Sequence, residues 1–132
     1  MLQTQEGAPV VSMDLSTRES DGQAVVALRG ELEVADAASV AAALVAVAAR
    51  ARVVIIDLAC LEFIDSSGIA ALVLARLQAR RAGGDLLLAA PQGQVLRVLA
   101  VIRLAEVFSV HASVHEAASS AGRCRRAVVA LP

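Results

Sequence analysis

The run Val53-Val54-Ile55-Ile56 constrains the fold more than any other feature of this sequence. All four residues are β-branched, and no polar residue interrupts the apolar pattern before Asp57. A strand with this pattern is covered on both faces or paired in the middle of a sheet. We therefore predict a strand at Val53–Leu58 that forms the centre of the sheet.

Two earlier segments have the patterns of shorter strands, Val10–Leu15 and Ala24–Arg29. The polar segment Ser16–Gly22 connects them and contains Asp21-Gly22, a strong turn signal. These features predict a β-hairpin near the start of the domain.

Helical periodicity predicts four helices after the hairpin. The first spans about Val34–Arg50, and the second spans about Gly68–Ala82 and ends at Gly83-Gly84. The third begins at Pro91, a residue suited to a first helical position, and the last begins near Ser113. The apolar faces expected to be buried are Val40, Leu44 and Val47 in the first helix, Ile69, Leu72, Val73 and Leu77 in the second, and Val95, Leu96, Leu99 and Ile102 in the third.

Strands are also expected at Asp85–Ala89 and Val107–Val110, so strands and helices alternate after residue 30. This alternation predicts α/β packing with partly parallel strands and right-handed crossovers. A chain of 132 residues is about one domain long, and a hydrophobic content of 58% argues against disorder. We expect a single domain over residues 10–121, with a flexible tail at 1–9 and a second tail at 122–132.

The charge balance argues against nucleic-acid binding. A net charge of −1 gives no long-range attraction to phosphate backbones, and Phe63 and Phe108 are the only aromatic residues available for base stacking. The N-terminus lacks the basic and apolar regions of a signal peptide, and no apolar run reaches the ~20 residues needed to span a bilayer. We expect a cytoplasmic protein without a membrane partner.

Metal binding is not expected from the few candidate ligands. His111 and His115 are four residues apart, with Glu116 and Cys124 as possible further ligands, but the last helix is predicted to begin only after His111, so we interpret both as surface histidines. Cys60 and Cys124 are interpreted as a small buried hydrophobe and a surface thiol. A regulatory disulfide between the two cysteines remains an alternative, and it requires Cα atoms within about 7 Å.

The sequence also lacks the motifs of common enzymes. The serine-nucleophile elbow requires a glycine two residues before the serine, but Ile64 precedes Ser66 and Asp65 precedes Ser67 at that spacing. No phosphate-binding Gly-x-x-x-x-Gly-Lys loop is present, because the chain contains no lysine. We predict neither catalytic activity nor a cofactor.

The segment Asp65-Ser66-Ser67-Gly68 is the strongest candidate for a functional site. It follows an apolar strand and begins a helix, where unpaired backbone N–H groups favour a capping oxygen or an added phosphate. An ordinary N-cap by Asp65 or Ser66 is one interpretation. A cap needs only one side chain, however, and the missing Cβ of Gly68 allows another backbone or a partner to approach closely. The surplus of polar groups favours a recognition site.

Two motifs resemble a known family. Residues 61–69, Leu-Glu-Phe-Ile-Asp-Ser-Ser-Gly-Ile, resemble the phosphorylation loop of the anti-sigma factor antagonists, small bacterial STAS-domain proteins. Gly30-Glu31-Leu32-Glu33 resembles a second marker of that family, Gly-Glu-Leu-Asp at the end of an early strand. The resemblance covers about residues 10–121, and Glu33 departs from it by replacing an aspartate.

The resemblance implies a STAS-like single domain with a mixed sheet of four to five strands and helices mainly on one face. It implies that Ser66 is phosphorylated by an anti-sigma factor that is an ATP-dependent serine kinase, and that a PP2C-type phosphatase reverses this. The unphosphorylated protein would bind the anti-sigma factor and free a sigma factor. The residues implied in partner binding are Glu31, Glu33, Asp65, Ser66, Ser67, Gly68 and Ile69.

An alternative interpretation keeps the predicted fold but assigns the protein a different function. The chain would then be a ligand-binding or scaffold module that uses a pocket near Glu31, Glu33 and the Ser66 loop without control by phosphorylation.

Overall fold

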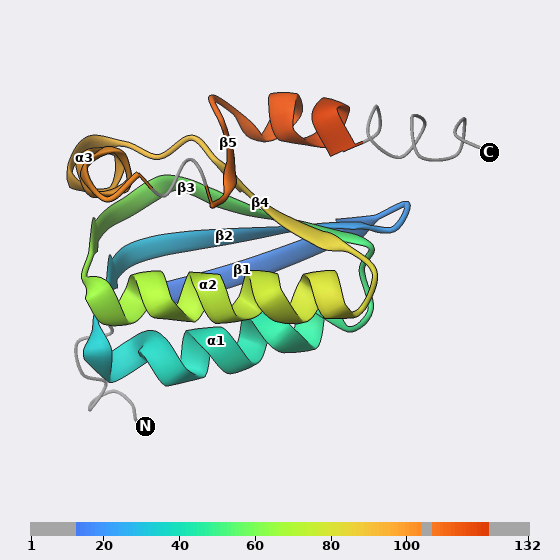
Figure 1. Cartoon of the computed structure of the whole chain (residues 1–132), viewed down its shortest axis with the longest axis horizontal. Helices are drawn as coiled ribbons and strands as arrows, with labels where there is room; N and C mark the ends of the chain where they lie inside the picture. The colour runs from blue at the N-terminus through green and yellow to red at the C-terminus, as the bar shows by residue number, and fades with distance from the viewer. Residues whose placement is uncertain (1–12, 104–106, 122–132) are drawn as a thin grey trace, which may run out of the picture.

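The computed structural model describes residues 13–103 and 107–121, which form a mixed α/β domain (Figure 1). The five strands lie in the order β1-β2-β3-β4-β5; β1 is antiparallel to β2, and the other neighbours are parallel. The elements in chain order are β1 Met13–Ser20, β2 Gln23–Leu32, α1 Val34–Ala48, β3 Val53–Ile64, α2 Ser66–Arg81, β4 Asp85–Ala89, α3 Gly93–Val101 and β5 Ser109–His111, followed by helical residues 114–121. The predicted fold class is confirmed. The expected tails, residues 1–9 and 122–132, lie outside the described residues.

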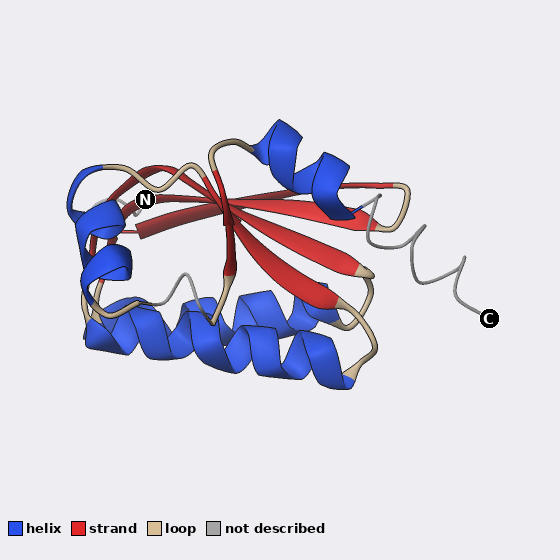
Figure 2. Cartoon of the chain, turned by 45° about the horizontal axis from the view of Figure 1, so that its top comes forward, coloured by secondary structure: helices blue, strands red, loops and turns tan. Residues whose placement is uncertain are grey.

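The central strand is β3, as its apolar run predicts. Val54 and Ile56 point into the large core formed with α1 and α2, which run side by side along one face of the sheet (Figures 1 and 2). Val53 and Ile55 point to the opposite face, where residues 114–121 pack on them. Because side chains alternate along a strand, only helices on both faces can bury four consecutive apolar residues.

The strands of the hairpin have different bounds from those predicted. β1 spans Met13–Ser20, so most of the segment 16–22 that was expected to connect two strands is itself strand. The turn contains only Asp21 and Gly22, with φ values of 53° and 81°, as a two-residue hairpin loop requires. The polar residues of β1 are tolerated because β1 is an edge strand with most of its side chains exposed.

β3 continues to Ile64, six residues beyond its predicted end, because it stays paired with β2 as far as Leu32 and Ile64. The pairing shifts register between Ala27 and Arg29. Cys60 lies opposite Arg29, just beyond this shift, and is exposed. The interpretation of Cys60 as a small buried hydrophobe was therefore wrong.

The buried face of α2 agrees only in part with the one predicted. The residues that face the core are Gly68, Ala71, Leu72, Ala75 and Ala79. Val73 and Leu77 are 38% and 45% exposed. α2 packs against both α1 and the sheet, and small side chains on that face allow the close approach. Leu72 is buried and Ile69 packs on the core as predicted, but counting only large apolar residues placed Val73 and Leu77 inside wrongly.

The third helix begins later than predicted. α3 starts at Gly93 rather than Pro91; Val95 and Leu99 are buried, but Leu96 and Ile102 are about half exposed. The short strand is Ser109–His111 instead of Val107–Val110. The last helix begins after Ser113, whose hydroxyl oxygen accepts a hydrogen bond from the Glu116 amide at 3.1 Å, as predicted for its start.

Candidate functional site

Two helices begin at the same end of the sheet, where the parallel strands β2 and β3 finish. β2 and β3 are parallel and end side by side at Leu32 and Ile64. The next residues, Glu33 and Asp65, are the N-caps of α1 and α2. The two motifs identified in the sequence, 30–33 and 61–69, are therefore brought together by strand pairing. We call this region the helix-start corner, defined by Glu31, Glu33, Asp36, Asp65 and Ser66.

One carboxylate caps both helices. Asp65 Oδ1 accepts a hydrogen bond from the Gly68 amide at 2.9 Å, and Asp65 Oδ2 accepts one from the Val34 amide at 3.2 Å. Glu33 supplies no side-chain cap for its own helix. Each such cap stabilises a helix by about 1 kcal/mol, so Asp65 both stabilises and joins the starts of α1 and α2. The expected capping role thus belongs to Asp65.

Ser66 takes no part in this capping arrangement. It is the first residue of α2, and its side chain is exposed. Within residues 13–103 and 107–121, neither the hydroxyl nor the amide N–H of Ser66 or Ser67 makes a hydrogen bond. Ser67 is half-buried. The Ser66 hydroxyl is therefore open to solvent and serves no structural purpose in the described part of the chain.

Gly68 lets the first turn of α2 rest on the strand ends. A Cβ at this position would lie 2.8 Å from Leu32 Cγ, 2.8 Å from Ile64 Cγ1 and 2.9 Å from the Leu32 carbonyl oxygen. All three distances are shorter than real Cβ contacts allow. The close approach anticipated at Gly68 is thus made by the chain's own β2 and β3.

The helix-start corner is acidic. The pKa of Glu33 is raised above 4.5, first by a hydrogen bond with the Glu31 side chain, then by partial removal from water and by repulsion from Glu31, Asp65 and Asp36. The positive ends of two helix dipoles offset part of this negative charge. A further anion at this corner would meet repulsion from the carboxylates and attraction from the helix N-termini.

Sequence reasoning missed three residues at this site. The Gln94 side chain of α3 accepts from the Ile64 amide and donates to the Ile64 carbonyl, each at 3.0 Å, and so fixes the residue before Asp65. Val34 and Phe63 are exposed apolar side chains, at 72% and 37%, next to the capped positions. No local pattern marks Gln94, because only the fold brings it to Ile64. Val34 was predicted to begin a helix and Phe63 belongs to the motif at residues 61–69, but neither pattern indicates that the side chain is exposed.

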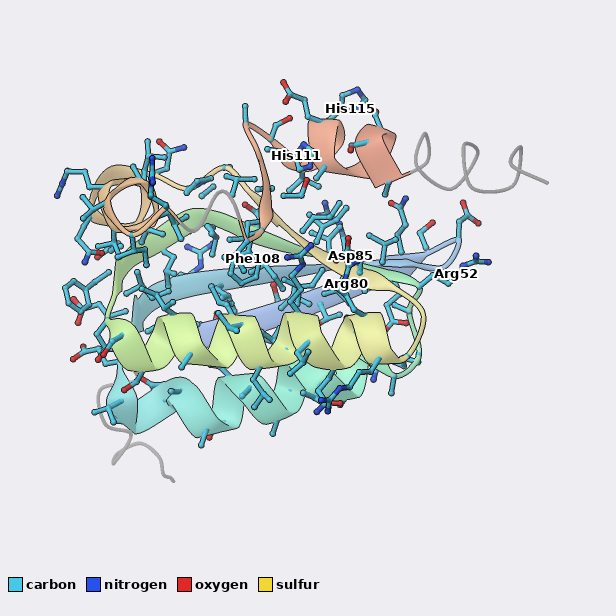
Figure 3. The ribbon with its side chains drawn as sticks, viewed as in Figure 1. Arg52, Arg80, Asp85, Phe108, His111 and His115 are labelled. Carbon is cyan, nitrogen blue, oxygen red and sulfur yellow. The ribbon has the colours of Figure 1, made fainter. Side chains whose placement is uncertain are left out.

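The other candidate residues lie elsewhere. His111 is on β5, where its Nε2 lies 2.9 Å from the Ser109 hydroxyl, and His115 is in the following helix (Figure 3). Among the described residues, no group of three side chains could hold a metal ion. None of the helices described is long and apolar enough to cross a membrane. Cys60 is a free cysteine and Cys124 lies outside the described residues, so the alternative of a Cys60–Cys124 disulfide is not tested further.

Comparison with known proteins gives one family match. The family model described as the STAS domain matches residues 14–117. Among curated proteins, none is similar enough in sequence to match.

Several solved structures are similar to the chain. An anti-sigma factor antagonist from Mycobacterium paratuberculosis is 23% identical with a TM-score of 0.76, covering 83% of this chain and 94% of its own. The Bacillus cell fate determinant SpoIIAA in its phosphorylated form is 19% identical with a TM-score of 0.64, covering 81% and 98%. A sulfate transporter family protein from Wolinella succinogenes is 19% identical with a TM-score of 0.66, covering 76% and 85%. At these identities the similarities establish the fold alone.

Proposed function

Because the chain belongs to the STAS-domain family, we propose that it is an anti-sigma factor antagonist whose binding to an anti-sigma factor is switched by phosphorylation of Ser66. It acts as a regulatory binding protein in the cytoplasm, and it is the substrate of a kinase rather than a catalyst. Unphosphorylated, it binds the anti-sigma factor and frees a sigma factor.

The observation that carries this proposal is the exposed, unbonded hydroxyl of Ser66 beside a carboxylate that already performs the capping. Asp65 satisfies the Gly68 and Val34 amides by itself. A kinase can therefore reach Ser66 without opening the domain, and phosphorylation breaks no hydrogen bond in the described residues. An ordinary structural serine would be bonded or buried.

The same geometry supports a change in binding with little change in fold. A phosphate adds roughly −1.5 to −2 charges at neutral pH. The amides of Ser66 and Ser67, which make no hydrogen bonds in the described residues, are local donors for it, and a helix N-terminus adds about 0.3–1 kcal/mol of favourable interaction. Burying that charge against a partner, beside Glu31 and Glu33, would cost several kcal/mol unless the partner paired it. Release then follows from repulsion at the interface.

The proposed partners are those that the resemblance to the anti-sigma factor antagonists implies. The kinase is an ATP-dependent serine kinase that is itself the anti-sigma factor, and a PP2C-type phosphatase restores the binding form. Two neighbours support this proposal by their own descriptions: one is an anti-sigma factor antagonist, and SpoIIAA exists in a phosphorylated form. The proposed interface comprises Glu31, Glu33, Asp65, Ser66, Ser67, Gly68 and Ile69, with Val34 and Phe63 as neighbouring apolar contacts.

The test is phosphorylation by the anti-sigma factors of the native host. Each candidate is incubated with the chain and ATP, and the modified residue is identified by mass spectrometry. We expect one phosphate on Ser66, none on Ser66→Ala, and normal modification of the matched variant Ser67→Ala. Phosphate confined to another residue contradicts the assignment. Stabilisation by a small molecule, with no phosphorylation by any candidate, would favour the ligand-binding alternative instead.

A further inference from the structure

Among the residues that the structure describes, no strand pairs with the outer edge of β1. β1 is the first strand of the sheet, and β2 is the strand that pairs with it among the described residues (Figure 1). An edge strand presents a row of unpaired N–H and C=O groups that can pair with another strand. β1 has eight residues, which is long for an edge strand left uncovered.

The hairpin turn decides which backbone groups point outward. In a two-residue loop, the flanking residues Ser20 and Gln23 exchange both backbone hydrogen bonds. Alternation along the strand then directs the N–H and C=O groups of the even-numbered residues of β1 towards β2. Those of Leu15, Thr17 and Glu19 are directed away from the sheet, towards the open edge.

We propose that β1 pairs with β1 of a second copy of this chain, antiparallel, around a two-fold axis at Ser16. In this register Leu15 of one copy lies opposite Thr17 of the other, and these residues form the backbone hydrogen bonds. Asp14 of one copy lies opposite Arg18 of the other. The result is a continuous sheet through two domains with an isologous interface.

A second copy is the expected partner because the charges along β1 match those of another β1 in the antiparallel orientation. By symmetry the register forms two Asp14–Arg18 pairs between the copies, at non-hydrogen-bonded positions where side chains approach most closely. Neither residue has an ion pair within residues 13–103 and 107–121, although Arg29 lies across from Asp14 on β2. Glu19, by contrast, is already paired with Arg50 at 2.8 Å.

Other registers do not offer these pairs. A shift by two residues places Ser16 opposite Asp14 or Arg18, and a shift by four places two aspartates or two arginines face to face. The inner face favours the same arrangement, because the half-buried side chains of Met13 and Leu15 would lose further contact with water. The helix-start corner lies at the ends of β2 and β3, which are the second and third strands counted from the β1 edge.

The test is the concentration dependence of mass by sedimentation equilibrium, using the full chain. We expect a monomer–dimer equilibrium in the wild type. Asp14→Arg alone and Arg18→Asp alone place like charges opposite each other twice, and should weaken dimerisation by about tenfold or more. The double swap restores opposite pairs and should return the dissociation constant to within a few-fold. Glu116→Arg, on the far helix, is the matched reversal that should change nothing.

Amide hydrogen exchange tests the same proposal at individual residues. The amides of Leu15, Thr17 and Glu19 should be protected only at concentrations where the dimer forms, while those of Asp14, Ser16 and Arg18 are protected at all concentrations. The proposal is overturned if the wild type stays monomeric up to about 1 mM. It is also overturned if the four charge variants dimerise with the same dissociation constant. Neither measurement involves a kinase, so the result is independent of the role of Ser66.

Discussion

The two ends of α2 use polar residues in opposite ways. At its C-terminal end, Arg80 binds Asp85 at 3.3 Å (Figure 3). Arg76 binds the same carboxylate at 3.2 Å, and its guanidinium lies 5.7 Å from the centre of the Phe108 ring. At its N-terminal end, the Asp65 side chain makes the capping bonds, and neither the hydroxyl nor the amide N–H of the two serines beside it makes a hydrogen bond in the described residues. The hydroxyl groups that the fold does not use lie at the end that we propose is regulated.

The largest effect should come from filling the space under the N-terminal end. Gly68→Val places atoms within contact distance of Leu32 and Ile64, and should lower the free energy of unfolding by about 3 kcal/mol. Urea unfolding measures this. Ala70→Val, two residues along on the exposed side of α2, controls for the lower helix propensity of valine and should cost under about 1 kcal/mol. Equal costs would mean that the helix start is not tightly packed.

Removing the shared cap should have the next largest effect on stability. Asp65→Ala leaves the Gly68 and Val34 amides without an acceptor, and should cost about 2 kcal/mol, twice the value for a single cap. Glu62→Ala removes a nearby exposed carboxylate and should cost almost nothing. A loss at Asp65 of no more than about 0.5 kcal/mol would show that one carboxylate does not join the two helices.

Substitution of Ser66 separates binding from stability. Ser66→Asp introduces a negative charge at the acidic corner and should weaken binding to the anti-sigma factor by more than about tenfold, or about 1.4 kcal/mol. Ser66→Ala should bind like the unphosphorylated protein. Calorimetry with the partner measures both affinities, and unfolding midpoints should change little. Equal affinities for the two variants would rule out the charge mechanism.

The C-terminal end of α2 should show the reverse pattern. Asp85→Asn removes the carboxylate that both Arg76 and Arg80 contact, and should lower stability by about 0.5–1 kcal/mol because these ion pairs are partly exposed. Affinity for the anti-sigma factor should stay unchanged. Both quantities can be measured on the samples used for Ser66. A strong loss of binding would place part of the interface at this end.

The smallest effect concerns the acidity of the helix-start corner. Because the pKa of Glu33 is higher in the folded protein than its ordinary 4.5, the folded state binds more protons, and stability should fall as pH rises from 4.5 through the raised pKa. Glu33→Gln should remove this decline, whereas Glu62→Gln should retain it. Urea midpoints between pH 4 and 7 provide the comparison. The same decline in Glu33→Gln would assign it to another group.

Much of the fold could be predicted because its signals are local. Val53–Ile56 identified the central strand, Asp21-Gly22 identified the turn, and Gly83 ended α2 with a φ of 90°. Exposure could not be predicted in the same way. Val73 and Leu77 were expected to be buried, yet the buried face of α2 consists mainly of alanines. The reason is that the distance between α2 and its neighbours depends on how all the elements pack together.

The order and type of the elements, and the polar helix start at residues 65–68, are specified by local sequence, since hydrophobic period and capping chemistry act over a few residues. The folded arrangement is needed for Asp65 to cap both α1 and α2, for Gln94 to bind Ile64, and for Glu31 to raise the pKa of Glu33. These contacts join residues up to 31 positions apart, and parallel pairing of β2 with β3 brings the two helix starts together.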